Sequence, residues 1–242
     1  MGKVSNESKQ NTVMLNTRQS FHDELAALEQ ELLHMGTLTG TMLSQAVEAV
    51  QQGDVALAEG VLSQDDTVDE MDRKIEAQCI RLLALQQPMA RDLRQIESAL
   101  KVITDLERIG DHAVDIAKIA RKLTQEFYLK APLLDIGPLA QTAQTMLHQS
   151  LESLVRHDLE LAIRVCDDDD HADDAFKVLR DELLALTQDK PSLVFPASYM
   201  LLAVVYLERI ADHATNIAER VYYIETGDRK PLGRRRARTE AA

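Results

Sequence analysis

Residues 106–117 read LERIGDHAVDIA and residues 207–218 read LERIADHATNIA, so nine of twelve positions are identical at an offset of 101. Farther upstream the two halves align at an offset of 104, which pairs Asp54 with Asp158 and Val61 with Val165. A three-residue deletion in the second copy reconciles the two offsets. The chain is therefore an internal duplication, and we expect both copies to fold as the same unit.

Each copy contains three long segments in which apolar residues recur every three or four positions, the period of an α-helix with one buried side. Asp54, Pro88, Asp158 and Pro191 mark breaks, because Asp favours the N-cap of a helix and Pro its first turn. Short connections make neighbouring helices antiparallel. We therefore predict an all-α fold, a tandem repeat of two antiparallel three-helix bundles with six long helices. The predicted helices cover residues 18–51, 54–86, 89–126, 138–157, 158–188 and 191–226.

The remaining segments complete the domain organisation. Residues 1–17 are polar and lack the apolar stretch of a secretory signal, so we predict a disordered N-terminal arm on a cytoplasmic protein. The two repeats then occupy residues 18–127 and 138–226, joined by a linker over residues 128–137. We predict that residues 227–242 form a basic, solvated C-terminal tail; the alternative is a tail that contacts lipid headgroups, nucleic acid or an acidic partner. No apolar run approaches the roughly 20 residues of a membrane span, so any membrane association should be indirect.

The formal net charge of −13 bears on the choice of partner. A strongly acidic surface repels the phosphate backbone, which argues against nucleic acid as a main partner. Cations and basic protein surfaces match this charge better.

Carboxylates form rows along the helices of both copies. Residues spaced by four lie on one stripe of a helix, and each row borders the apolar stripe. The rows are Glu107, Asp111 and Asp115 with Glu208 and Asp212 in the second copy, and Asp65, Asp69, Asp72 and Glu76 with Asp169 and Asp173 in the second copy. Like charges four residues apart cost about 0.2–0.5 kcal/mol per pair. The rows therefore favour a hard cation such as Mg²⁺, Mn²⁺ or iron; the alternative is a solvated surface neutralised by Arg and Lys.

Other reactive side chains are given structural roles. Cys79 and Cys166 each lie within an apolar stripe, which predicts buried, inert thiols. His112 and His213 repeat, but each lies about 100° around the helix from its carboxylate row. We interpret both as surface salt-bridge residues.

The usual catalytic motifs are missing from the sequence. The one Glu-x-x-His pair, Glu31 with His34, has no counterpart in the second copy, whereas a di-iron carboxylate enzyme takes such motifs from two helices. There is no glycine-rich phosphate loop, nucleophile elbow or Cys-His cluster. We therefore predict a protein that is not an enzyme.

A tandem of three-helix units whose last helices carry L-E-R-I-[GA]-D resembles the PhoU family, and the resemblance extends from about residue 18 to residue 226. The stretch QPMARDLR at residues 87–94 is similar to the family's segment that opens the third helix. The stretches DDTVD at 65–69 and DDHAD at 169–173 agree as well.

The resemblance implies metal clusters on the helix surfaces and a regulatory role. Carried over by position, the ligands of one site would be Asp65, Asp69, Glu107 and Asp111, and those of the other Asp169, Asp173, Glu208 and Asp212. The metal would be a divalent or trivalent ion: iron, manganese, magnesium or zinc. The implied protein is a homodimeric, non-catalytic adaptor between the ATPase subunit of the high-affinity phosphate ABC transporter and a phosphate-sensing histidine kinase, and it restrains phosphate uptake and the phosphate-starvation regulon. The competing possibilities are a metal-dependent enzyme with a multinuclear centre and a plain helical scaffold.

Overall fold

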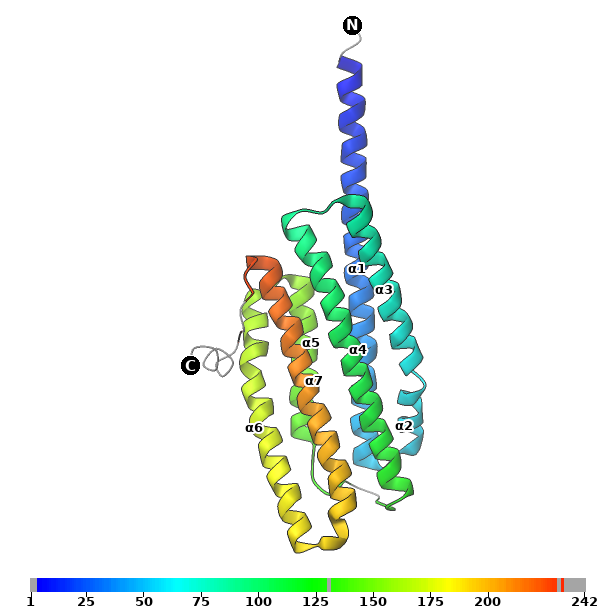
Figure 1. Cartoon of the computed structure of the whole chain (residues 1–242), viewed down its shortest axis with the longest axis vertical. Coiled ribbons are helices and arrows are strands. Elements are labelled where there is room, and N and C mark those ends of the chain that lie inside the picture. The colour runs from blue at the N-terminus through cyan, green and yellow to red at the C-terminus, as the bar shows by residue number, and fades with distance from the viewer. Residues whose placement is uncertain (1–3, 130–131, 230–231, 233–242) are drawn as a thin grey trace.

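The computed structural model describes residues 4–129, 132–229 and 232, with side chains from residue 19 onward. All regular structure in these ranges is helical, which confirms the predicted all-α fold (Figure 1). The elements are α1 (Val4–Gln52), α2 (Val55–Leu62), α3 (Asp65–Gln86), α4 (Ala90–Gln125), α5 (Gly137–Arg156), α6 (Leu159–Asp189), the 3₁₀ turn η1 (Pro191–Leu193) and α7 (Val194–Thr226).

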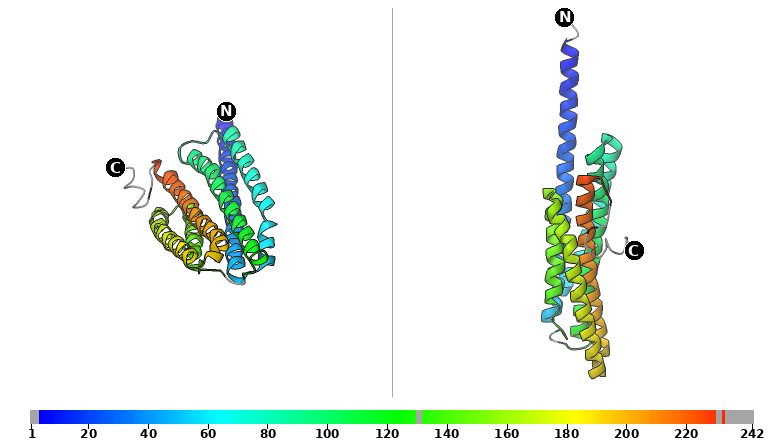
Figure 2. Two further views of the ribbon diagram at one scale, coloured as in Figure 1. Left: turned by 60° about the horizontal axis from the view of Figure 1, so that its bottom comes forward. Right: turned by 90° about the vertical axis from the view of Figure 1, so that its left-hand side faces the viewer.

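The helices form two units of the same design, each a bundle of three helical segments. In the first unit α1, the α2–α3 pair and α4 all contact one another, and in the second unit α5, α6 and α7 do the same. The two units meet mainly along α4 and α7, and α1 also contacts α5. The views in Figure 2 show α4 and α7 side by side and antiparallel. The duplication therefore places the third helix of one copy directly against the third helix of the other.

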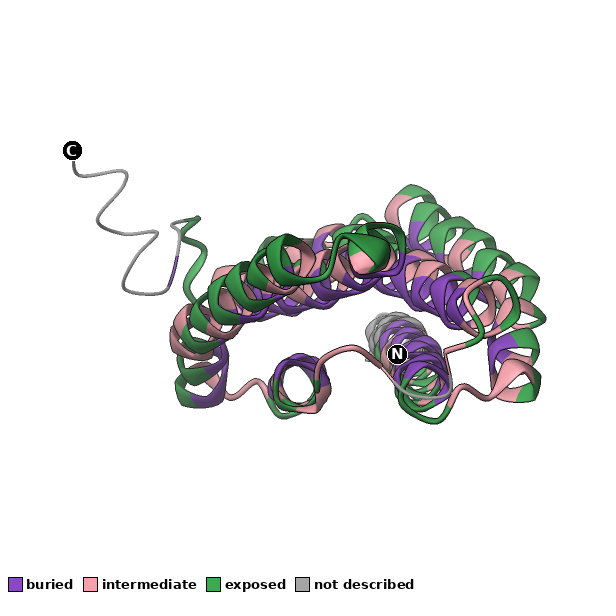
Figure 3. Cartoon of the chain, turned by 90° about the horizontal axis from the view of Figure 1, so that it is seen from below, coloured by how far each residue is buried: buried purple, intermediate pink, exposed green. Residues whose placement is uncertain are grey.

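Buried residues lie on the inward faces of these helices, as the colouring in Figure 3 shows along the long axis of the molecule. The apolar stripe expected on α4 is fully in the core, because each of its residues is at most 2% exposed: Leu106, Ile109, Ala113, Ile116, Ala117 and Ala120. Cys79 and Cys166 are buried, as predicted. Burial raises the pKa of the Cys79 thiol to about 12, so almost no thiolate forms at neutral pH.

The second helix of the first repeat differs from the prediction, because it is interrupted at Ser63 and Gln64. The backbone N–H of Gln64 donates to the carbonyl of Val61 at 3.0 Å, a tighter turn than the α-helix allows. The Gln64 side chain then donates to the Gly60 carbonyl at 3.1 Å. A new helix starts at Asp65, where acidic side chains are favoured by the helix dipole. The prediction of one continuous helix over residues 54–86 is wrong at this point, whereas α6 runs unbroken.

The N-terminal helix also starts earlier than predicted. α1 begins at Val4, so residues 4–17, which the sequence assigns to a disordered arm, are helical. This stretch contains no Gly or Pro. Extending an existing helix costs far less than nucleating a new one, so the helix anchored in the first bundle continues through it. Most of the predicted basic tail, residues 230–231 and 233–242, lies outside the described residues.

One segment of the described chain, Pro191–Thr226, is long and apolar enough to cross a membrane by length and composition. The same segment packs against α4, α5 and α6. A core helix of a helical bundle passes the same test, so its apolar composition is accounted for by packing.

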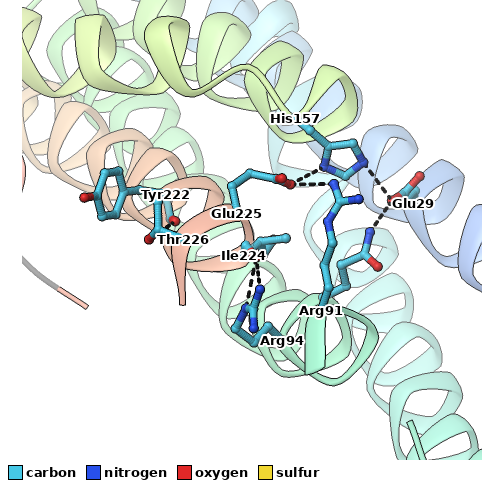
Figure 4. A network of polar contacts seen from close by, with 9 residues as sticks. Glu29, Arg91, Arg94, His157, Tyr222, Ile224, Glu225 and Thr226 are labelled. Carbon is cyan, nitrogen blue, oxygen red and sulfur yellow. Dashed lines mark hydrogen bonds and ion pairs between the residues drawn. The ribbon is translucent and has the colours of Figure 1, made fainter. Parts of the chain in front are cut away.

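A polar junction ties the two units together at the end of α7 (Figure 4). Arg94 of α4 donates from Nε and Nη2 to the main-chain oxygen of Ile224, at 2.9 and 2.8 Å. Nearby, Arg91 forms an ion pair with Glu225 at 2.6 Å. α7 ends at Gly227, whose φ of 79° suits glycine. Arg94 therefore satisfies a carbonyl that the end of the helix would otherwise leave without a partner.

Replacing Arg94 with alanine should lower the free energy of unfolding by about 1–2 kcal/mol, because a charged donor is lost from a partly buried carbonyl at the helix end. Urea-induced unfolding followed by circular dichroism measures this change. The control is Arg91→Ala, which removes a more exposed ion pair and should cost less than about 1 kcal/mol. Equal losses in the two variants would contradict a capping role for Arg94.

Candidate functional site

The first predicted carboxylate face spans the groove line along which the neighbouring helices α3 and α4 contact each other. Burial raises the pKa of Asp65, and the nearby charges of Asp111 and Asp69 raise it further. Burial likewise raises the pKa of Glu107, with added contributions from Asp111, Asp72 and Asp69. Charges on α3 and α4 thus act on each other across the groove. Asp69 and Asp111 thus lie near enough for their charges to act on both Asp65 and Glu107.

The second face repeats this arrangement between α6 and α7. Burial raises the pKa of Glu208, and the charges of Asp212, Asp173 and Asp169 raise it further. All three neighbours belong to the predicted ligand set. Asp212 lies on α7 with Glu208, whereas Asp169 and Asp173 lie on α6. Both copies of the duplicated unit therefore carry a partly buried acidic face that favours protonation or a bound cation.

Basic side chains offset part of this negative charge. Arg108 lies 2.9 Å from Asp111 and 3.3 Å from Glu107, and Lys177 lies 3.7 Å from Asp173. Among the residues that the structure describes, no group of three or more His, Cys, Asp or Glu side chains converges closely enough to hold a metal ion as the side chains lie. The donor set still fits a hard cation, since both faces offer carboxylate oxygens and the pKa values of Glu107 and Glu208 stay raised despite the adjacent arginines.

Asp72 also belongs to the first face, although the predicted ligand set does not include it. Its pKa is raised by burial, by Glu76 and by Asp69, and its charge acts on Glu107 across the groove. Asp72 lies three residues after Asp69 and so continues the row on α3. This spacing is the sequence feature that could have placed Asp72 in the ligand set. The second copy has no carboxylate at the equivalent residue, Phe176, so the two faces are not equal.

His112 and His213 do not lie where the sequence analysis places them. His112 is only 9% exposed, and its ring stacks on Tyr206 at a centroid distance of 5.2 Å and lies 5.7 Å from the ring of His213. Burial, together with the charges of His213 and Arg209, lowers the pKa of His112 to about 4, so its ring is neutral at neutral pH. The prediction of a surface salt bridge is wrong for His112, because the repeated helices face each other there.

His213 does contact a carboxylate, but this contact crosses between the two units. Its Nδ1 lies 2.9 Å from Oδ1 of Asp105, which also accepts a hydrogen bond from Asn216 at 3.1 Å. Asp105 was missed from the sequence because the repeat offset gives it no acidic counterpart: the equivalent residue is Tyr206. Three polar side chains thus connect α4 to α7 inside the joint between the units.

The fold and these faces define a class of protein: two pseudo-symmetric three-helix units that join along their third helices and carry an acidic groove each. The family model described as the PhoU domain matches this chain twice, over residues 32–120 and 136–221. The chain belongs to the PhoU family.

Relatives and solved structures agree with this assignment. A protein of Clostridium acetobutylicum named phosphate-specific transport system accessory protein PhoU homolog is 38% identical over 217 residues, covering 89% of this chain and 99% of the relative. A Synechocystis relative of the same name is 39% identical over 214 residues, covering 88% and 94%. The crystal structure of PhoU from Pseudomonas aeruginosa superimposes with a TM-score of 0.83 at 36% identity, over 86% of this chain and 100% of that chain. The Streptococcus pneumoniae structure, titled as the phosphate transport system regulatory protein PhoU, has a TM-score of 0.80 at 32% identity and covers 88% and 100%.

Proposed function

We propose that this protein is an accessory protein of a high-affinity phosphate uptake system, and that it restrains uptake and the phosphate-starvation genes when phosphate is plentiful. The observation that carries the proposal is the name shared by relatives 33–39% identical over most of the chain, each called a phosphate-specific transport system accessory protein PhoU homolog. The length of this chain matches theirs, because the aligned region covers at least 91% of each of these relatives.

We propose that it acts by binding and carries out no chemistry of its own. The sequence lacks the motifs of nucleotide, acyl-transfer and zinc chemistry, and both repeats present long acidic helix faces. Such a surface suits partners with basic faces. In this proposal a homodimer in the cytoplasm links the ATPase subunit of the transporter to the phosphate-sensing histidine kinase.

We further propose that the acidic faces bind iron, manganese, magnesium or zinc. The ligands would be Asp65, Asp69, Glu107 and Asp111 on one face, and Asp169, Asp173, Glu208 and Asp212 on the other. The support is electrostatic: these carboxylates repel one another at short range, and burial weakens the screening by water. A bound cation would add positive charge to the two faces.

A strain without this protein should take up phosphate without restraint and express phosphate-starvation genes in phosphate-rich medium. Uptake of radiolabelled phosphate and a reporter driven by a phosphate-starvation promoter measure the two effects. Expression of the unaltered chain from a plasmid should restore repression. The protein should also pull down the ATPase subunit or the cytoplasmic part of the sensor kinase, and this association should slow as salt rises.

Any second homologue in the strain must be deleted as well, so that it does not cover the loss. Normal repression in that strain would contradict the proposed function. The metal-dependent enzyme would then be the leading possibility.

A further inference from the structure

A pocket of about 530 Å³ lies at the joint between the two units, and it borders the second acidic face, with which it shares Asp212. Its lining comes from equivalent positions of the two repeats. The residues that line it are Arg108, His112, Arg209, Asp212, His213 and Asn216. Arg108 and Arg209 are counterparts in the duplication, and so are His112 and His213. The pocket therefore lies where the pseudo-two-fold relation between the repeats brings a segment next to its own copy.

The antiparallel course of α4 and α7 explains why the arginines meet here. Contacts between these helices run from Arg91 with Glu225 at one end to Lys122 with Tyr199 at the other. Near the middle, Asp105 contacts His213, and His112 stacks on Tyr206. Only at this midpoint do equivalent residues of the two copies lie opposite each other. Two guanidinium groups are thus placed at one pocket, in a chain whose net charge is −13.

The charges in and around the pocket are unevenly compensated. Arg108 is paired with Glu107 and Asp111, at 3.3 and 2.9 Å. Arg209 forms no ion pair or hydrogen bond with any residue in the described part of the chain, but its charge partly offsets the raised pKa of the adjacent Glu208. Asp212 contributes one negative charge to the lining, and Asp105, behind the lining, is already engaged by His213 and Asn216. An anion is favoured on the side of the pocket formed by the arginines.

His112 supplies a second, independent observation. Its side chain lines the pocket and is more than nine-tenths buried, and Nδ1 has no hydrogen-bond partner in the described residues. A buried polar atom without a partner is unfavourable, so a group that hydrogen-bonds to the imidazole would recover free energy. A cation is a poor candidate, because two arginines line the same space.

We propose that this pocket binds a tetrahedral oxyanion, inorganic phosphate, between Arg108 and Arg209 with His112 as a hydrogen-bonding partner. The planar guanidinium fork suits two oxygens of one phosphate, and charge-assisted hydrogen bonds are the strong ones. The choice of phosphate among oxyanions rests on the proposed function, whereas the placement of the site rests on the pocket. Because both repeats contribute an arginine, bound phosphate would hold α4 and α7 together, and phosphate supply would stabilise one arrangement of the two units.

Equilibrium dialysis of the full-length protein against radiolabelled inorganic phosphate tests this proposal, with and without a chelator to exclude phosphate held by metal. We expect binding that persists with the chelator and weakens by about 10-fold or more in the Arg108→Ala, Arg209→Ala double variant. Arg209→Lys should be intermediate, because it keeps the charge and loses the fork. Arg121→Ala is the matched control, since it removes an α4 arginine that pairs with Glu59 instead.

Several outcomes would overturn the proposal. One is the absence of binding at 10 mM phosphate, which would limit the binding free energy to about 2.7 kcal/mol. The others are binding that requires metal, unchanged binding in the double variant, and binding of ATP or sulfate in preference to phosphate. Because this assay uses purified protein, its failure leaves the effect of the gene deletion on phosphate repression untouched. Normal repression in the deletion strain, in turn, would leave the dialysis result standing as oxyanion binding.

Discussion

Replacing Asp105 with alanine is expected to lower the free energy of unfolding by about 2–3 kcal/mol. The Asp105 side chain is 14% exposed and that of His213 is 22% exposed, so the contact lies mostly out of water. Removing the carboxylate leaves the His213 ring and the Asn216 amide without their common acceptor. A donor left without a partner in such a place costs more than the net gain of an ordinary hydrogen bond.

Urea-induced unfolding measures this loss, and Asp115→Ala is the matched control. Asp115 is also an aspartate on α4, but it is 35% exposed, pairs with Lys118 on its own helix at 3.0 Å and contacts α7 through the Tyr206 hydroxyl. Because this contact is more exposed to water than that of Asp105, the control should cost about 1 kcal/mol or less. Asp105→Asn should recover part of the loss, because the amide oxygen still accepts a hydrogen bond. If Asp105→Ala and Asp115→Ala prove equal within error, the polar link between α4 and α7 contributes little to stability.

A double-mutant cycle with His213→Ala assigns the effect to the contact itself. The sum of the two single losses should exceed the total loss of the double variant by about 1–2 kcal/mol, because the two residues share one interaction. Purely additive losses would place the effect of Asp105 elsewhere on α4.

The fold could be predicted because two signals in the sequence act locally and agree. The three-to-four-residue period of apolar side chains reports which side of each helix is buried, and residues such as Leu106, Ile109 and Ile116 are fully buried as expected. The duplication then fixes the number of helices by repeating the pattern. The break at Ser63 and Gln64 escaped prediction, because those residues are tolerated in a helix and the turn depends on hydrogen bonds formed only in the folded chain.

The candidate faces could be predicted within one repeat, but the joint between repeats could not. Carboxylates on adjacent antiparallel helices of one bundle must come close, and the pKa values of Glu107 and Glu208 reflect that closeness. The burial of His112 depends on which faces of the two bundles meet, and periodicity within one helix is silent about this. In retrospect a signal exists: the segment with the highest identity between copies, 106–117 with 207–218, spans the place where the copies touch. A residue beside a pseudo-two-fold axis has similar surroundings in both copies, so the same side chain serves both.

Replacing Glu107 and Asp111 together with alanine is expected to abolish metal binding on the first face while leaving helicity unchanged. Both groups border the core without filling it, since Glu107 is 25% and Asp111 is 37% exposed at the side chain. The pKa of Glu107 is raised by burial and by Asp111, which means that its ionised form is destabilised in the fold. Losing that charge relieves repulsion, so the metal-free variant should melt at or slightly above the temperature of the metal-free parent.

Elemental analysis of purified protein, after equilibration with iron, manganese, magnesium or zinc in separate samples, measures the bound metal. Glu208→Ala with Asp212→Ala should have the same effect on the second face, and the quadruple variant should bind none on either. The matched control is Asp66→Ala with Glu70→Ala, which removes two exposed carboxylates at the same spacing on α3. That pair does not contribute to the raised pKa of Glu107, whereas Asp69 and Asp72 do.

The comparison between the two pairs of variants decides what the acidic rows are for. If metal content falls only when residues facing the grooves are changed, the position of the carboxylates determines binding and the total charge does not. An equal fall in the Asp66, Glu70 control would indicate diffuse attraction of cations to an acidic surface, which is screened at high salt. If neither face pair alters metal content, the rows are solvated surface. The raised pKa values of Glu107 and Glu208 would then be a cost of placing acidic helices side by side, offset in part by Arg108 and Arg209.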